Sequence, residues 1–350
     1  MLALALAPAF AASDADAMAK WLEFKAKFEK TYGTSEEESD RFGVFVENLA
    51  RAERLEASDA GTATYGVTRF SDLTEGEFGR LMLRHAPRTD EQKARTPAWD
   101  GACTACKRFP ELNATVTAGS AIDWTTMGAV TDVKDQGQCG SCWSFGTTGD
   151  VEGVHFLAGN DLVSLSEAQL VQCDEGTKIS GGTGNLGCNG GLQEDAFDYL
   201  INDAPGGLVS EDFYPYPESV YRGTTGECSK SDAELKANVQ ATISSWSQVS
   251  SRASQEDNIL PALTKSGPLT IGINAGNMQL YTGGVADPRS CPASGVDHAV
   301  LIVGYGTDAG SPYWKIKNSW GTSWGEDGYY RIVEGSNACG VATDVVHSAA

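Results

Sequence analysis

Four side chains that lie far apart in the sequence together offer the chemistry of a hydrolase with a cysteine nucleophile. Cys142 lies in the stretch Gln-Gly-Gln-Cys-Gly-Ser-Cys-Trp at residues 136–143, where a helix is expected to begin, and His298 and Asn318 follow far downstream. A helix N-terminus and a neighbouring imidazolium both stabilise a thiolate, the reactive form of cysteine. We therefore predict Cys142 as the nucleophile and His298 as its general acid and base.

Two amide side chains would complete this site. Asn318 is expected to hydrogen-bond the second imidazole nitrogen of His298 and to fix the orientation of the ring. Gln136 and the backbone N–H of Cys142 would stabilise the oxyanion of a tetrahedral intermediate, where one such donor contributes about 3–4 kcal/mol. Trp320 is expected to shield the hydrogen bond between Asn318 and His298 from water. The remaining histidines are predicted to be ordinary core or surface groups: His85, His155 and His347.

Helices and strands that could position these residues follow from the pattern of apolar residues. Helices are expected at residues 142–159, after a cap formed by Ser166 and Gln169, and at residues 192–201. Short β-like runs broken by glycines follow at residues 269–273, 298–304, 313–317 and 329–333. A helical half followed by a strand-rich half indicates an α+β protein with two lobes.

The front of the chain has a different character. Residues 14–58 indicate two helices, the first with an apolar stripe of Trp21, Phe24 and Phe28, and the second with a capping box of Ser35 and Glu38. Residues 66–74 indicate a short strand and a turn. The polar stretch at residues 89–118 indicates a linker, and it contains the sequon that begins at Asn113.

Charge and cysteine content exclude several classes of protein. The net charge of −21 would repel nucleic acid and anionic membranes, so we exclude both as partners. No run of 18 apolar residues predicts a membrane span, whereas residues 1–12 resemble a cleaved secretory signal. With 9 cysteines, one nucleophile leaves eight others for four disulfides, which would indicate an oxidising compartment.

Three other classes of protein share some of these features: a thiol–disulfide oxidoreductase, a zinc-binding module and a non-enzymatic relative. The two Cys-x-x-Cys pairs, which end at Cys106 and Cys142, have the spacing of a thiol–disulfide oxidoreductase or of half a zinc site. Neither pair lies in a βαβ pattern, and no further pair completes a tetrahedral set of ligands, so we expect no metal and no cofactor. A non-enzymatic relative on the same fold would typically lack one of the four candidate catalytic residues, all of which are present here.

These motifs resemble those of the papain-like cysteine proteases, specifically cathepsin L-type proenzymes, over nearly the whole length from Trp21 to Ala342. The matching stretches in the rear part include Asp-Trp at 123–124, residues 136–145, Gly-Cys-Asn-Gly-Gly at 187–191, Asp-His-Ala-Val at 297–300 and Asn-Ser-Trp-Gly at 318–321. In the front part Glu37, Arg41, Phe45 and Asn48 match an interspersed helix motif. Departures from the family pattern are Ala52, Glu56 and Thr68.

The resemblance implies the organisation and the disulfides of the chain. It implies a papain-like two-lobed fold with a helical lobe at 113–230 and a β-barrel-like lobe at 231–350, preceded by an inhibitory propeptide at 13–112. The mature N-terminus should fall within residues 113–120. Three disulfides are implied: Cys139–Cys188, Cys173–Cys228 and Cys291–Cys339. Cys103 and Cys106 lie outside this pattern and could pair with each other, pair with another molecule or stay reduced.

The resemblance also implies a substrate cleft. The second pocket, which selects the residue before the scissile one, would have the walls Leu192, Gln193, Gly272, Val296 and Ala299. Its floor would be Asp344, which predicts acceptance of apolar side chains and of some arginine, unless Asp344 points to solvent. Other substrate contacts are expected from Gly190, Gly191, Asp297 and Trp320. No insertion resembles the occluding loop of cathepsin B, so we expect an endopeptidase.

The same resemblance supplies expectations about partners and location. Protein and peptide substrates, the chain's own propeptide and cystatin-type inhibitors are the expected partners, and a monomer is the expected state. The secretory pathway, leading to a lysosome, a vacuole or the outside of the cell, is the expected location. A glycine-rich insertion near residues 176–186 has no assigned purpose.

Overall fold

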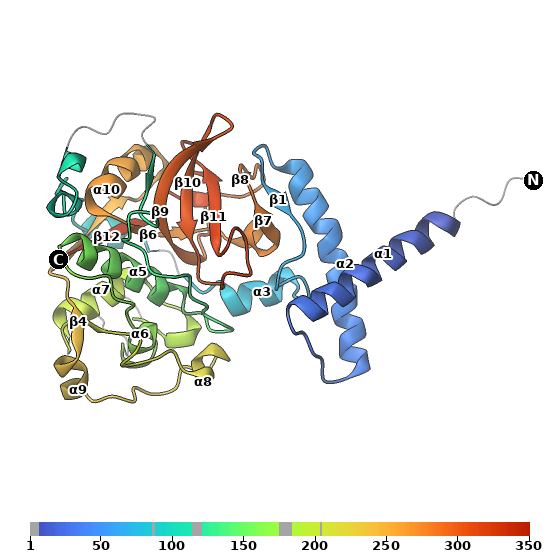
Figure 1. Ribbon diagram of the computed structural model, residues 1–350, viewed down its shortest axis with the longest axis horizontal. Coiled ribbons are helices and arrows are strands. Elements are labelled where there is room, and N and C mark those ends of the chain that lie inside the picture. The colour runs from blue at the N-terminus through green and yellow to red at the C-terminus, as the bar shows by residue number, and fades with distance from the viewer. Residues whose placement is uncertain (1–6, 86–87, 114–120, 175–183, 204) are drawn as a thin grey trace, which may run out of the picture.

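The chain folds into a helical N-terminal unit and a larger part in which helices pack against one mostly antiparallel sheet (Figure 1). The computed structural model describes residues 7–85, 88–113, 121–174, 184–203 and 205–350, without the side chains of residues 7–14 and 95. The helices are α1 (Ala7–Lys27), α2 (Ser35–Ser58), α3 (Glu75–Met82), α4 (Asp90–Arg95), α5 (Cys142–Leu157), α6 (Glu167–Cys173), α7 (Gln193–Asn202), α8 (Glu218–Tyr221), α9 (Asp232–Ala237) and α10 (Ile259–Ser266). The strands are β1 (Thr64–Tyr65), β2 (Ile122–Asp123), β3 (Leu208–Val209), β4 (Val239–Ala241), β5 (Ser245–Ser250), β6 (Leu269–Ile273), β7 (Tyr281–Gly283), β8 (Val285–Ala286), β9 (His298–Asp308), β10 (Ser311–Lys317), β11 (Tyr329–Val333) and β12 (Val345–Ala349).

Aromatic side chains hold the N-terminal unit together. Trp21 and Phe24 on α1 and Phe45 on α2 are buried, and the Phe45 ring lies 5.3 Å from the Trp21 ring and 5.1 Å from the Phe24 ring. The apolar stripe of α1 therefore faces α2, where these rings bury large apolar surfaces. Figure 1 shows that α1 crosses α2 at the side of the molecule away from the C-terminus.

The predicted capping box at the start of α2 is wrong by one residue. The cap is Thr34, whose extended backbone lets its hydroxyl accept the N–H of Glu37 at 3.1 Å. Ser35 is already the first residue of α2, so its hydroxyl cannot cap the turn that contains Glu38. The Glu37 carboxylate instead accepts the N–H of Gly33 at 2.8 Å.

The segment between α2 and α3 docks on the larger part of the molecule. Strand β1 pairs antiparallel with β7, with Thr64 opposite Gly283 and Tyr65 opposite Tyr281. The sequence predicts the strand within residues 66–74, but it lies just before them, at residues 64–65. Residues 66–74 themselves form a turn that leads into α3.

The prediction of a polar linker at residues 89–118 is wrong for the described part, residues 89–113. This part holds α4 and two short 3-10 helices at Ala105–Lys107 and Pro110–Asn113. The indole N–H of Trp99 donates to Ser266 at 3.0 Å, and Ala105 is fully buried. The segment is ordered because its few apolar side chains pack on the larger part. Residues 114–118 lie outside the described residues.

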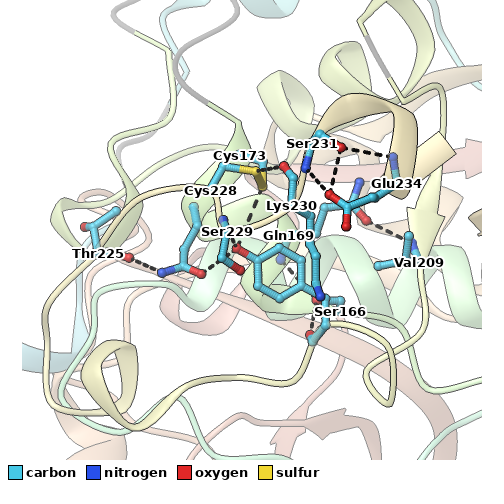
Figure 2. The surroundings of a disulfide bond; sticks show 12 residues. Ser166, Gln169, Cys173, Val209, Thr225, Cys228, Ser229, Lys230, Ser231 and Glu234 are labelled. Carbon is cyan, nitrogen blue, oxygen red and sulfur yellow. Dashed lines mark hydrogen bonds between the residues drawn. A yellow bond between two sulfur atoms is a disulfide. The ribbon is translucent and has the colours of Figure 1, made fainter. Parts of the chain in front are cut away.

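Helices α5, α6 and α7 form the core of the helical lobe. Helix α6 is capped as predicted, because the Ser166 hydroxyl accepts the N–H of Gln169 at 3.0 Å. The Gln169 side chain in turn accepts the N–H of Val209 at 2.8 Å. Figure 2 shows these contacts beside the disulfide that joins Cys173, at the end of α6, to Cys228.

The second lobe is built on an eight-stranded sheet. Seven strands follow the order β5-β12-β6-β9-β10-β11-β8, and β2 pairs with β9 off this path. Strand β9 is the centre of the sheet and is buried along its first nine residues. Among the described residues β5 and β8 are the ends of an open path, so the sheet does not close into a barrel.

Packing between the lobes brings the two halves of the predicted site together. Helix α5 packs against β9 and β6, and the backbone N–H of Ala299, near the start of β9, acts on the thiol of Cys142 at the start of α5. None of the helices in the described ranges is long and apolar enough to cross a membrane.

Candidate active site

Cys142 is the first residue of α5 and the one cysteine that is not in a disulfide. Its side chain is fully buried. The preceding cap residue, Ser141, makes no side-chain hydrogen bond to the first turn of α5, so the helix N-terminus is left to act on the thiol. The backbone N–H of Ala299, the residue after His298, lies close enough to the sulfur to lower its pKa. Cys142 on α5, the candidate nucleophile, therefore lies close to the strand residue that carries the candidate imidazole, His298 on β9.

His298 is held by Asn318 and covered by Trp320. Its Nε2 lies 2.8 Å from Asn318 Oδ1, which also accepts the N–H of Ser319 at 2.8 Å. An amide oxygen only accepts, so Nε2 carries the hydrogen and Nδ1 of the neutral ring has the free lone pair. Nδ1 has no hydrogen-bond partner among the described residues. The Trp320 ring stacks on the imidazole with 4.7 Å between centroids.

The side-chain amide of Gln136 is held in place by hydrogen bonds on both its nitrogen and its oxygen. Gln136 Nε2 donates to Cys139 O at 2.9 Å and to Met82 O at 3.3 Å. Its Oε1 accepts the Ser319 hydroxyl at 2.7 Å, which fixes which way the amide points. The Gln136 amide nitrogen therefore donates one hydrogen bond to Cys139 and one to the carbonyl of Met82, the last residue of α3.

Burial keeps both candidate catalytic groups uncharged in this form of the chain. Burial raises the pKa of the Cys142 thiol to about 11, although backbone N–H groups, including those of Ala299 and Arg84, act to lower it. Burial lowers the pKa of His298 to about 4, against the opposing hydrogen bond to Asn318. Both shifts favour the uncharged thiol and the uncharged imidazole over a thiolate–imidazolium pair while the propeptide covers the site.

The N-terminal segment runs through the site after α3. Met82 O contacts Gln136, and the next residues pass over the glycines of the helical lobe: a Cβ on Gly190 would lie 2.3 Å from Arg84 O. His85 forms a parallel β-bridge with Gly191, and its N–H donates to Asp297 O at 2.9 Å. The segment therefore lies along the edges where the sequence predicted substrate to bind.

The predicted second pocket is filled by the imidazole of His85. A Cβ on Gly272 would lie 2.9 Å from His85 Nε2 and 3.4 Å from Asp344 Cβ. Glycine is therefore required at residue 272 for any side chain to enter as deeply as His85 does. Asp344 Oδ2 lies 3.6 Å from His85 Nε2. Asp344 is buried in the zymogen, where the propeptide side chains of His85 and Arg88 lie against its carboxylate.

The other predicted contact residues surround the same cleft. Gln193 Nε2 donates to Thr270 Oγ1 at 3.1 Å and to Ile271 O at 3.3 Å, so this side chain joins α7 to β6 beneath the pocket. Leu192 is half-buried at the start of α7. Val296, Ala299 and Trp320 are also buried.

Two charged residues in this region were not predicted from the sequence. The guanidinium of Arg88 donates to Asp344 Oδ1 from Nε at 3.1 Å and from Nη2 at 2.6 Å. Glu194 Oε1, from the first turn of α7, lies 2.8 Å from Arg88 Nε. The side chains of all three residues are at most 3% exposed. The sequence offers only a weak signal for Glu194, since an acid in the first turn of a helix is common. It offers none for Arg88.

The disulfides account for the other eight cysteines. The three pairs implied by the resemblance are present: Cys139–Cys188, Cys173–Cys228 and Cys291–Cys339. Cys103 is joined to Cys106, which settles the alternatives in favour of pairing with each other. Because Cys139 pairs with Cys188, the Cys-x-x-Cys unit that ends at Cys142 is not a redox pair. The described residues contain no cluster of three or more metal-binding side chains.

The residues of the N-terminal unit that depart from the family pattern still form hydrogen bonds or pack in the interior. Thr68 donates to Gln279 O at 2.6 Å, and Glu56 accepts the N–H of Tyr65 at 3.1 Å. Ala52 is buried. The matching residue Asn48 donates to Ser71 O and Leu73 O, both at 2.9 Å, and so ties α2 to the segment before α3.

Comparisons with known proteins agree with this geometry. The profile of the papain family cysteine protease matches residues 118–349, and that of the cathepsin propeptide inhibitor domain (I29) matches residues 21–78. Cysteine proteinase 15A of Pisum sativum is 46% identical over 326 residues, which cover 91% of this chain and 82% of that protein. Cathepsin F of Mus musculus is 40% identical over 92% of this chain and 62% of its own length. The structure of digestive procathepsin L 3 of Tenebrio molitor larval midgut superposes with a TM-score of 0.76 at 33% identity, over 95% of this chain and 99% of that one.

The chain thus has the fold and the site of a thiol-dependent hydrolase with an inhibitory segment in its cleft. It belongs to the papain family of cysteine proteases and carries a cathepsin-type propeptide, so it is a cysteine endopeptidase in zymogen form. This confirms the family resemblance that the sequence indicated.

Proposed function

We propose that Cys142 and His298 carry out acyl transfer from peptide bonds once the propeptide has left the cleft. His298 Nδ1 takes the proton of the Cys142 thiol, and the sulfur attacks the scissile carbonyl carbon. The oxyanion accepts hydrogen bonds from Gln136 Nε2 and from the backbone N–H of Cys142. His298 then gives its proton to the leaving amine, which leaves a thioester on Cys142.

Hydrolysis of the thioester completes the cycle. A water molecule gives a proton to His298 as its oxygen attacks the thioester carbonyl. The tetrahedral intermediate collapses, the carboxylic acid departs, and the thiol of Cys142 takes back the proton from His298. Asn318 holds the imidazole in one orientation through both steps, and Trp320 keeps water away from their hydrogen bond.

The single observation that carries this proposal is the hydrogen bond from Gln136 Nε2 to the carbonyl of Met82, two residues before Arg84, whose backbone N–H acts on the buried thiol of Cys142. A carbonyl oxygen of the propeptide accepts a hydrogen bond from the same amide nitrogen that we propose as a donor to the substrate oxyanion. The order of contacts also explains why the segment inhibits. In a substrate the second-pocket residue precedes the scissile carbonyl, whereas His85 follows Met82. The propeptide therefore runs in the reverse direction to a substrate and places no scissile bond at the sulfur.

We also propose the pocket specificity, the site of activation and the cellular location that the family resemblance implies. The second pocket accepts apolar side chains and, through Asp344, some arginine. Activation removes the residues before the 113–120 region. Four disulfides suit an oxidising compartment of the secretory pathway, a lysosome, a vacuole or the outside of the cell. Cystatin-type inhibitors and a monomeric state remain predictions.

A pH titration of the purified 350-residue protein tests the proposal. Mass and cleavage of a Phe-Arg reporter are followed from pH 7 to pH 4, with and without an epoxide inhibitor of cysteine proteases. We expect loss of the N-terminal segment, activity that the epoxide abolishes, and one inhibitor adduct on Cys142. An intact mass without activity, even after an added protease removes the N-terminal segment, would refute the proposed function.

A further inference from the structure

The buried carboxylate of Glu194 has no role in the mechanism above, and it lies beside the second pocket. It belongs to the first turn of α7, directly after the predicted wall residues Leu192 and Gln193. Arg88 Nε lies 2.8 Å from its Oε1, and no other described side chain donates to either carboxylate oxygen. A buried carboxylate with so few donors is costly, so its retention requires a charged neighbour. In the zymogen that neighbour is Arg88.

Arg88 shows what kind of group the site holds. Its guanidinium lies between the carboxylates of Asp344 and Glu194, and Nη2 also donates to Gln248 Oε1 at 3.0 Å. The ring of Trp246 lies 5.9 Å from the guanidinium carbon. These four partners all belong to the part of the chain that follows residue 120, so they stay behind when the propeptide leaves. Among the described hydrogen-bond partners, Thr96, which accepts from Nη1 at 2.8 Å, departs with it.

The site is continuous with the second pocket. Asp344 separates the two propeptide side chains: Oδ1 faces Arg88, and Oδ2 lies 3.6 Å from the imidazole of His85. The charge of His85 acts on Glu194 as well as on Asp344. A side chain that enters from the cleft over Gly272 in place of His85 therefore approaches both carboxylates. Arginine is longer than histidine and carries a planar fork of donors that can bridge two acceptors.

Removal of the propeptide takes away Arg88, the cation that pairs with both carboxylates among the described residues. Burial and the charge of Asp344 already raise the pKa of Glu194 to about 7 with Arg88 in place, and Arg88 acts to lower it. In the activated enzyme a basic side chain from the substrate would restore the lost charge balance, whereas an apolar side chain would not. The pocket should therefore discriminate more strongly for arginine than Asp344 alone would allow.

We propose that Glu194 is a second specificity-determining residue, which together with Asp344 makes the second pocket a two-carboxylate site for a substrate arginine. This inference rests on the proposed function, because it concerns the pocket that selects the residue before the scissile one. Arg88 holds this site in the zymogen, and a substrate guanidinium takes its place after activation.

The test compares cleavage of Arg-Arg and Leu-Arg dipeptide reporters by the activated enzyme and its Glu194→Gln variant. The substitution keeps the shape of the side chain and removes the charge. We expect kcat/KM for Arg-Arg to fall about 10- to 100-fold, as when one partner of a buried charge pair is removed. The value for Leu-Arg should stay within about 2-fold of wild type. The matched control is Glu218→Gln, which removes one charge from an exposed residue of the same lobe and should leave both values unchanged.

The outcomes separate this inference from the proposed function. If both enzymes cleave Leu-Arg and the ratio of Arg-Arg to Leu-Arg is the same in Glu194→Gln and wild type, Glu194 has no role in specificity and the inference is wrong. If neither reporter is cleaved by wild type, the proposed function fails. Binding of the two dipeptide amides is then measured on Cys142→Ala protein, with and without Glu194→Gln, after an added protease removes the propeptide. Loss of affinity for the Arg-Arg amide alone supports the inference, and equal affinities overturn it.

Discussion

Replacing Arg88 by alanine should open the zymogen without acidification. The side chain makes two hydrogen bonds to Asp344, one to Gln248 and an ion pair with Glu194, and its guanidinium is almost fully buried. Its loss leaves the two buried carboxylates without their guanidinium partner for as long as the propeptide stays in place, and only His85 remains beside Asp344 among the described propeptide residues. Removing one partner of a buried pair costs about 3–5 kcal/mol. Since about 1.4 kcal/mol corresponds to a factor of ten, the fraction of open zymogen should rise by about two to three and a half orders of magnitude.

The assay measures labelling of Cys142 in uncleaved zymogen by a peptidyl epoxide at pH 7. In the wild-type zymogen the thiol is covered and neutral, so labelling should be slow. Arg88→Ala should be labelled much faster before any loss of mass, and Arg88→Lys should lie between, because lysine keeps the charge but cannot bridge two carboxylates. Arg80→Ala, which changes an exposed arginine of α3, is the matched control and should behave as wild type. Equal labelling rates for Arg88→Ala, Arg80→Ala and wild type would refute the argument.

The pH dependence of this effect follows from the two carboxylates. Burial and the charge of Asp344 raise the pKa of Glu194 to about 7 in the wild-type zymogen, and loss of the opposing charge of Arg88 raises it further. On acidification the group in Arg88→Ala therefore takes up a proton, and one of the two charges disappears. Against the effect of burial, His85 and Arg88 hold the pKa of Asp344 below its ordinary value of 3.8. An acid with a lowered pKa contributes stability above its ordinary pKa and loses it only as the pH falls through the lowered value. The difference between Arg88→Ala and wild type should therefore shrink between pH 8 and pH 5 but persist at pH 5.

Three further predictions concern the oxyanion site, the propeptide and its disulfide. Gln136→Ala should lower kcat/KM of the activated enzyme about 10²- to 10³-fold, and a loss below about 5-fold would remove Gln136 from the oxyanion site. The hydrogen bond from Arg41 is the largest of the effects that lower the pKa of Glu77 to about 2, so the contribution of this pair is present above pH 4.5 and lost towards pH 2. Glu77→Gln should therefore lower the thermal unfolding temperature of the zymogen by the same amount at pH 7 and at pH 5. If variant and wild type unfolded at the same temperature at pH 5, this explanation would be wrong. Replacing Cys103 and Cys106 by serine should cost the zymogen about 2 kcal/mol, because the closed loop is short, and should leave the activated enzyme unchanged in thermal unfolding and in kcat/KM.

The family, the candidate catalytic residues and most elements of the larger part could be predicted from the sequence. Helix α5, the cap at Ser166 and strands β6 and β11 lie where periodicity and capping signals indicate, because each depends on residues close together in the chain. The same local signals failed at the start of α2, where Thr34 and Ser35 are adjacent hydroxyl residues and either could have been the cap. They also failed at residues 89–113, where docking on another part of the chain, rather than local propensity, orders the segment.

The sequence by itself determined that this protein has a cysteine nucleophile, an imidazole partner and an orienting amide, since those side-chain types in those contexts already define the chemistry. Only the tertiary structure decided what occupies the cleft. His85 and Arg88 carry no motif, and Glu194 is one acid among many in the chain. They meet at Asp344 because the reversed path of the propeptide and the packing of α7 against the sheet bring together residues that are far apart in the chain, such as Arg88 and Asp344, which are 256 positions apart. A buried ion pair depends on that three-dimensional proximity, which no local pattern of residues records.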